Sequence, residues 1–153
     1  MAQGKESADV VSTSVTGYEA RVAVRGHEIT VDEPAGDGGK DQGPMPTELL
    51  LAALASCYTL ALRWAAKRRD VQLGEIQVTA TGTYEHLRFA SIRLEVRADF
   101  PEGEAAALLS DARRVCYVSN TLAGDVGIEV ALGDRQRSIG APTSEPYSTH
   151  EPS

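Results

Sequence analysis

The sequence predicts an α+β fold in which antiparallel sheets are wrapped around one long buried helix. Alternating apolar and polar residues come in pairs of short runs, over residues 18–32 and 76–98, as in β-hairpins. Between these pairs, the stretch from Leu49 to Leu62 has no charge, no Gly and no Pro, which predicts a helix that is apolar on every side. Strands and helices do not alternate one by one, so a parallel βαβ sheet is not expected.

The two ends of the chain differ from its middle. Residues 1–15 are polar and aperiodic, and residues 133–153 are rich in Pro, Ser, Thr and charge, so both predict flexible tails. The remaining residues, 16–132, are expected to form one domain, which is an ordinary size for a single hydrophobic core.

The first hairpin is expected around Gly26, which separates an alternating run that starts at Tyr18 from one that ends at Val31. The segment 34–44 that follows is rich in glycine. It has neither the GxGxxG pattern nor the spacing of a P-loop, so we expect a flexible connection and not a phosphate site.

The central helix is predicted to run from Pro46 to Arg69. Proline suits the first helical turn, and Glu48 and the basic residues 67–69 complement the helix dipole at its two ends. A helix that is apolar all round needs cover on all sides, which one small domain can hardly supply. We therefore expect a homodimer with a shared core.

The second half of the chain predicts four further features. These are a hairpin over residues 76–98, an amphipathic helix capped by Asp99 and ending at Cys116, a short helix from Ser119 to Gly124, and a closing strand over residues 126–132.

The charge balance narrows the classes of partner. The chain has 22 Asp and Glu against 15 Lys and Arg, a formal net charge of -7, and no basic cluster, so neither nucleic acid nor an anionic membrane is expected to bind. The uncharged stretch is shorter than the about 20 apolar residues that span a bilayer. The N-terminus has no signal-peptide core, so we expect a soluble, cytoplasmic protein.

The two cysteines are the first candidates for chemistry. Cys57 lies in the middle of the apolar helix, where a free cysteine often packs as a small hydrophobic residue. Cys116 follows Arg113 and Arg114, which would stabilise a thiolate, but it also completes the apolar stripe of its helix. The residues alone leave catalytic, redox-active and structural roles open. The histidines show no ligand spacing to either cysteine, so no metal and no other cofactor is expected.

Two phrases resemble one family of proteins. GPMPTELLLAALASCY, and further along the chain VCYVSNTL, resemble the OsmC/Ohr family, which is named for osmotically inducible protein C and the organic hydroperoxide resistance proteins. The segment RGHEITVDEPAGDGGKDQGP resembles an OsmC-like subgroup. The resemblance covers residues 18–132.

The resemblance implies an OsmC-like fold, with an intertwined homodimer and active sites at the subunit interface. It also implies a thiol-dependent peroxidase that reduces organic hydroperoxides. By position, Cys57 would be the peroxidatic cysteine and Cys116 the resolving one, and the two would join in an intramolecular disulfide. A thiol reductant, either a lipoyl group or a small thiol, would reset them.

The same resemblance implies an activating cation. Arg25 from the first hairpin, or Arg21 on the same strand face, would stabilise the Cys57 thiolate, and Glu48 would hold that arginine. Two positions depart from the family pattern. Thr47 stands where the hydroperoxide-resistance branch has its glutamate, and Tyr117 stands where a proline usually follows the second cysteine.

Two other functions compete with the peroxidase. One is a non-catalytic protein of the same fold, whose interface pocket holds an apolar small molecule. The other is a structural or partner-binding module whose cysteines are inert.

Overall fold

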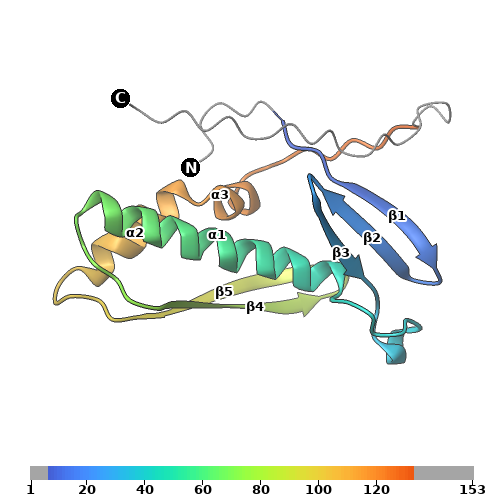
Figure 1. Cartoon of the computed structure of the whole chain (residues 1–153), viewed down its shortest axis with the longest axis horizontal. Coiled ribbons are helices and arrows are strands. Elements are labelled where there is room, and N and C mark those ends of the chain that lie inside the picture. The colour runs from blue at the N-terminus through green and yellow to red at the C-terminus, as the bar shows by residue number, and fades with distance from the viewer. Residues whose placement is uncertain (1–6, 133–153) are drawn as a thin grey trace. The chain divides into compact units, whose positions relative to one another are not determined.

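The computed structural model describes residues 7–132 (Figure 1). The chain divides into two units. Among the described residues, a sheet unit comprises 7–46 and 130–132, and a helical unit comprises 47–129. The predicted single domain over residues 16–132 stays a prediction. The predicted C-terminal tail, residues 133–153, lies outside the described residues.

The sheet unit is built on an antiparallel three-stranded sheet with the order β1-β2-β3. Its strands are β1 (Val11–Thr16), β2 (Glu19–Val24) and β3 (His27–Val31). The predicted hairpin around Gly26 is confirmed as β2 and β3. Strand β1 corrects the expectation of a loose tail up to residue 15. Its serines and threonines hide the strand alternation, and pairing with β2 is what makes the segment a strand.

A buried carboxylate organises the loop after β3. Asp32 is 1% exposed. Its carboxylate accepts hydrogen bonds from the backbone N–H groups of Glu33 and Lys40, each at 2.9 Å, and of Gln42 at 3.3 Å. Burial alone would raise the pKa of Asp32, but these hydrogen bonds and the charge of Lys40 lower it overall, so the carboxylate stays ionised at neutral pH.

The glycine-rich segment is therefore an ordered loop, and the expected flexible connection is not what the structure contains. It includes a short 3-10 helix, η1 (Ala35–Asp37). A side chain at Gly39 would collide with the backbone of Glu33, and one at Gly43 would collide with the backbone of Thr30. These glycines are needed because the loop backbone passes directly against β3 and the residues that follow it.

The helical unit contains α1 (Pro46–Arg68), β4 (Ile76–Glu85), β5 (Arg88–Ala98), α2 (Ala105–Val115) and α3 (Tyr117–Ala123). Strands β4 and β5 pair in antiparallel register from Ile76 opposite Ala98 to Glu85 opposite Arg88. Helix α1 lies along this hairpin (Figure 1). The inner hairpin residues pack on a core that is built mainly from α1 and α2: Leu54, Tyr58, Ala61, Leu62, Ala65, Ala66, Leu73, Leu108, Ala112 and Cys116.

The predicted helices are present, with two shifted starts. Helix α2 begins at Ala105, with Glu104 as its N-cap, and not at Asp99, because Pro101–Glu104 forms a turn closed by a 3.1 Å hydrogen bond. Helix α3 begins at Tyr117 and not at Ser119, because Cys116 adopts the extended conformation that separates it from α2.

The predicted closing strand over residues 126–132 does not form. Its apolar residues are instead exposed, from 62% at Val126 to 104% at Leu132. The period-2 pattern is typical of a strand, but no described strand pairs with this segment, so backbone hydrogen bonding does not fix it.

Within one chain, helix α1 is buried on one side only, and the cover expected from a second copy stays a prediction. Its buried residues form a stripe towards the core, whereas Leu60 is 65% exposed and Leu50 is 39% exposed. By length and composition α1 would suffice to cross a membrane. This is weak evidence, because the core helices of soluble proteins pass the same test, and the buried stripe is typical of such a core helix.

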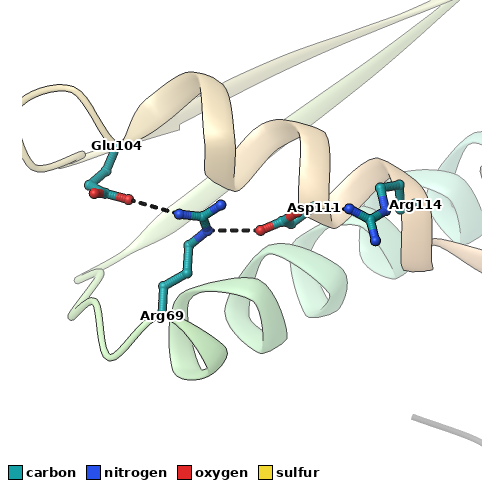
Figure 2. A network of polar contacts seen from close by, with 4 residues as sticks. All are labelled: Arg69, Glu104, Asp111 and Arg114. Carbon is teal, nitrogen blue, oxygen red and sulfur yellow. Dashed lines mark hydrogen bonds and ion pairs between the residues drawn. The ribbon is translucent and has the colours of Figure 1, made fainter.

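A charged network fastens α2 to the C-terminal end of α1 (Figure 2). Arg69, just after α1, lies 2.8 Å from the carboxylate of Asp111 and 3.6 Å from that of Glu104, and Asp111 also contacts Arg114 at 3.5 Å. The hydrogen bond to Asp111 raises the pKa of Arg69, so this guanidinium stays charged. The network helps to set where the end of α2, and with it Cys116, lies against α1.

Candidate functional site

The two cysteines, far apart in sequence, are brought together in the helical unit. Cys57, in the middle of α1, packs against the core that contains Cys116, and the two thiols are close enough for Cys116 to shift the pKa of Cys57. Cys116 is 0% exposed, whereas Cys57 is half-buried, and both are free thiols. The more accessible thiol is thus the one in α1.

The surroundings of Cys57 favour its protonated form. Burial raises the pKa of its thiol, and the contact with Cys116 raises it further. The backbone N–H groups of Val118 and Tyr117 act in the opposite direction and lower it. These are the first N–H groups of α3, which have no acceptor within the helix. No cation is among the described groups that shift this pKa, so Cys57 needs one from elsewhere to ionise readily.

Tyr58 is the residue beside Cys57 that joins α1 to α2. It is 8% exposed, and its hydroxyl donates a 2.9 Å hydrogen bond to the backbone oxygen of Leu109. The pKa of Tyr58 is raised by burial and by the charge of Cys116, and lowered by Arg113. The phenol therefore stays protonated, and it lies within electrostatic range of both Cys116 and Arg113.

A cavity of about 1090 Å³ adjoins this cluster within the helical unit. Its wall is mostly apolar and comes from α1, the β4–β5 hairpin, α2 and α3. It includes Leu50, Leu54, Ile92, Leu94, Val96 and Leu109. Neither cysteine lines it, but Tyr58 and Ser119 do, and the hydroxyl of Ser119 donates to the backbone oxygen of Cys116 at 3.1 Å. The wall of the cavity therefore includes a neighbour of each cysteine but neither thiol.

One part of the wall of the cavity is tied to the start of α1. The hydroxyl of Tyr84, near the end of β4, donates a 2.7 Å hydrogen bond to the hydroxyl oxygen of Thr47. The Tyr84 ring packs on Phe89 with 4.5 Å between centroids. A side chain at Gly82 would collide with Phe89, so this glycine keeps the space for the ring. Thr47, the position that departs from the family pattern, therefore orients an aromatic wall of the cavity.

The charges that line the cavity are all basic. They are Arg88 and Arg113; the imidazole of His86 also lines the cavity, and no Asp or Glu is among the lining residues. Arg88 pairs with Glu85 at 2.9 Å. Arg113, by contrast, forms no ion pair or hydrogen bond with any residue between 7 and 132. Its charge is therefore available to a ligand.

The predicted activating residues belong to different parts of the structure. Arg25 lies in the β2–β3 turn of the sheet unit, with a left-handed φ of 54° that is uncommon outside glycine. Arg21, in β2, lies 3.7 Å from Glu28. Glu48 is in the first turn of α1. The pairing of either arginine with Cys57, and the holding role of Glu48, stay predictions.

Some residues that line the cavity were not predicted from the sequence. Tyr58 and Tyr84 carry no motif, and only the fold brings their hydroxyls to Leu109 and Thr47. Arg113 was noted for Cys116, but the structure places it at the cavity. In residues 7–132, no group of three or more His, Cys, Asp and Glu residues is arranged to hold a metal ion.

The chain is similar to known proteins in both sequence and structure. The family described as OsmC-like protein matches residues 38–131. An uncharacterised protein of Haloferax volcanii is 26% identical over 100 residues, which is 63% of this chain and 76% of that protein.

Several solved structures share the fold. An OsmC-like protein from Mycoplasma pneumoniae superposes with a TM-score of 0.66 at 19% identity, over 78% of this chain and 89% of that one. An organic hydroperoxide resistance protein from Legionella pneumophila superposes with a TM-score of 0.60 at 21% identity, over 80% of this chain and 93% of that one. An organic hydroperoxide resistance protein from Elizabethkingia anophelis superposes with a TM-score of 0.61 at 25% identity, over 81% of this chain and 93% of that one. The α+β fold expected from the sequence is thereby confirmed.

Proposed function

The chain belongs to the OsmC-like protein family, and from this premise we propose that it is a thiol-dependent peroxidase that reduces organic hydroperoxides. The observation that carries the proposal is the packing of Cys57 against the core cluster that contains Cys116, with the thiol of Cys116 near enough to shift the pKa of Cys57. Relatives of the same fold are named as organic hydroperoxide resistance proteins, which fits this chemistry.

In the proposed reaction, Cys57 is the nucleophile. Its thiolate attacks the terminal oxygen of the hydroperoxide, the O–O bond breaks, and the departing alkoxide takes a proton to become an alcohol. Cys57 is left as a sulfenic acid. The Cys116 thiol then attacks its sulfur, the S–O bond breaks, water leaves and a disulfide forms. A dithiol, such as a lipoyl group, or two small thiols reduce the disulfide and restore both cysteines.

The thiolate requires assistance, because burial and Cys116 both oppose ionisation of Cys57. The N–H groups of Tyr117 and Val118 provide part of it. In the proposal Arg25 provides the rest, with Glu48 holding the guanidinium and Arg21 as the second candidate.

The proposal includes an intertwined homodimer in the cytoplasm. The exposed apolar residues of α1 and of the 126–132 segment support it, since a second copy would cover such surface. Neither nucleic acid nor membrane is a proposed partner.

Mass spectrometry tests the reaction. After one equivalent of an organic hydroperoxide, the reduced protein should lose both free thiols and give a peptide that links Cys57 to Cys116. The Cys116→Ser variant should stop at a sulfenic acid on Cys57, which dimedone traps. If both thiols remain open to alkylation after peroxide treatment, the peroxidase proposal is wrong.

A binding protein is the second candidate, and the cavity favours it because neither cysteine lines it. In that case the Cys57→Ser variant would bind an apolar ligand as the parent does, and the parent would not turn over peroxide.

A further inference from the structure

Tyr58 connects the two helices that carry the cysteines. It follows Cys57 directly in α1, and its hydroxyl donates a 2.9 Å hydrogen bond to the backbone oxygen of Leu109 in α2. Leu109 stands seven positions before Cys116, which is about two helical turns, so both lie along the same side of α2. The hydrogen bond therefore starts next to one thiol and ends on the side of α2 that leads to the other.

This hydrogen bond is shielded from water. Tyr58 is 8% exposed, and Leu108 and Ala112, which flank Leu109 in α2, are 0% exposed. A buried hydrogen bond is not readily exchanged for one to water, so it restricts how far α1 and α2 can slide past each other. The pKa of Tyr58, raised first by burial, is raised further by the charge of Cys116, so the phenol lies within electrostatic range of that thiol.

The charged network of Arg69 connects the same two helices at a greater distance from the thiols. Arg69 lies 2.8 Å from Asp111, and both side chains are partly exposed. Twelve positions separate Arg69 from Cys57, which is about 18 Å along a helix. Because exposed ion pairs contribute little, we expect this network to fix the positions of the thiols less closely than the Tyr58 hydrogen bond does.

We propose that Tyr58 is a positioning residue, whose hydrogen bond to Leu109 holds Cys116 within reach of Cys57 for the step that forms the disulfide. This role rests on the proposed peroxidase function. In that step the sulfur of Cys116 bonds to the sulfur of the Cys57 sulfenic acid, the S–O bond breaks, and the hydroxide leaves as water with the thiol proton. Tyr58 gives no proton to this step, and it acts through the relative position of α1 and α2.

The size of the effect follows from the strength of one hydrogen bond. Positioning raises the effective concentration of one thiol at the other. The net contribution of a hydrogen bond corresponds to about threefold to tenfold in an equilibrium constant. The Tyr58→Phe variant removes the hydroxyl and keeps the ring, and the Leu109 oxygen retains its helical hydrogen bond within α2, so the fold should be retained.

Time-resolved trapping after rapid mixing with one equivalent of an organic hydroperoxide separates the two chemical steps. In Tyr58→Phe, the sulfenic acid on Cys57, trapped with dimedone, should form as fast as in the parent. Its conversion to the disulfide should be about threefold to tenfold slower. With excess hydroperoxide, the variant should therefore give more sulfinic acid at Cys57, which mass spectrometry detects. Equal rates of disulfide formation in parent and variant, or equal slowing of both steps, would overturn the assignment.

Two further variants separate positioning from general support of the fold. Ser56→Ala is the matched control, because Ser56 precedes Cys57 and its hydroxyl donates to the backbone oxygen of Ala53 within α1. It should form the disulfide as fast as the parent. Arg69→Gln should slow disulfide formation less than Tyr58→Phe does. Equal slowing in these two variants would mean that any connection between the helices positions the thiols, which overturns the specific role of Tyr58.

A redox titration of the full-length protein with glutathione separates this inference from the peroxidase proposal, because it needs no hydroperoxide. Glutathione and its disulfide equilibrate the two thiols with the Cys57–Cys116 disulfide, and that equilibrium gives their effective concentration. A disulfide about threefold to tenfold less favoured in Tyr58→Phe than in Ser56→Ala, without peroxide turnover in the parent, would support the positioning role and contradict the peroxidase. Turnover with the same equilibrium in parent and Tyr58→Phe would do the reverse. A parent that forms no disulfide at any glutathione ratio would overturn the assignment.

Discussion

At the scale of single residues, the central fact is that Cys57 is held as a thiol by its own surroundings. Burial and Cys116 raise its pKa, and two backbone N–H groups offset only part of that effect. In the proposed peroxidase, a cation beside Cys57 would favour the thiolate near neutral pH. The pH dependence of the reactivity of the Cys57 thiol tests which residue provides that cation.

The first prediction concerns Arg25. If it activates Cys57, the Arg25→Gln variant should shift the midpoint of the pH profile for Cys57 alkylation upward by about one unit, because a nearby positive charge favours the thiolate. Iodoacetamide labelling from pH 5 to 10, with mass spectrometry to identify the labelled cysteine, measures this. Arg21→Gln serves as the matched variant, since Arg21 already has Glu28 close by. A midpoint that is the same in all three proteins would exclude both arginines.

The second prediction concerns Asp32, whose pKa is lowered in the folded chain. A lowered pKa means that the ionised carboxylate stabilises the fold above the pKa of the unfolded chain. This contribution is lost as the pH falls from about 4 towards the lower folded value. The Asp32→Asn variant should be less stable than the parent at pH 7, with a smaller difference at pH 3. Urea unfolding at both pH values measures it.

Asp37→Asn, in the same loop, is the control for that experiment, because the backbone hydrogen bonds described above go to Asp32 and not to its side chain. If Asp32→Asn lost as much stability at pH 3 as at pH 7, the loop would not depend on the charge of Asp32.

At the scale of elements, α2 carries the contact between the two cysteines. Leu108 and Ala112 of this helix are 0% exposed against α1, and the charged network of Arg69 adds a polar connection at one end. The apolar contact is the stronger of the two, since exposed ion pairs contribute little to stability.

The third prediction tests that ranking. Leu108→Ala should destabilise the protein by about 2–5 kcal/mol, because it removes buried volume and leaves a cavity. Leu87→Ala, at a position that is 103% exposed, should change stability by less than about 0.5 kcal/mol. Denaturant unfolding followed by circular dichroism compares the two. Equal effects would mean that α2 does not pack on the core as described.

Sequence patterns predicted the helices and strands well where the apolar periodicity is strong. They predicted them less well where pairing with another segment determines whether a strand forms. Helix α1 and both hairpins follow from apolar spacing. Strand β1 exists because β2 lies beside it, and the 126–132 segment has strand alternation with no described partner. The early start predicted for α2 treated Asp99 as a cap, although the proline and glycine that follow it form a turn.

The candidate site was predictable only in part. The two cysteines stand out in sequence, and the structure brings them together. Asp32 accepts a hydrogen bond from Lys40, and Tyr58 donates one to Leu109. The sequence separations of these two pairs follow neither the helical nor the strand period. Such contacts depend on how elements pack, so local patterns carry no signal for them.

At the scale of the whole molecule, the main question is what covers the apolar surface of α1. Leu60 is 65% exposed in the middle of the most apolar helix of the chain. An isolated exposed leucine is ordinary, but Leu50 of the same helix is exposed as well, and four apolar residues of the 126–132 segment are exposed in their own part of the chain. These exposed residues support the proposed dimer.

The fourth prediction follows from that surface. Leu60→Glu should shift the protein from dimer to monomer, because a charge buried without a partner opposes association. Sedimentation velocity over a range of concentrations detects the shift. Leu87→Glu, a change at another exposed leucine, should leave the assembly as it is. A dimer that survives Leu60→Glu would require an interface elsewhere.

The closeness of Cys57 and Cys116 has one further consequence, for heat resistance. A covalent bond between them would tie the middle of α1 to the end of α2 and close a long loop. Closing a loop of that length reduces the conformational entropy of the unfolded chain, which raises the free energy of unfolding by about 4 kcal/mol. The oxidised protein should thus melt well above the reduced one, so a simple melting curve would report the redox state of each sample without any label.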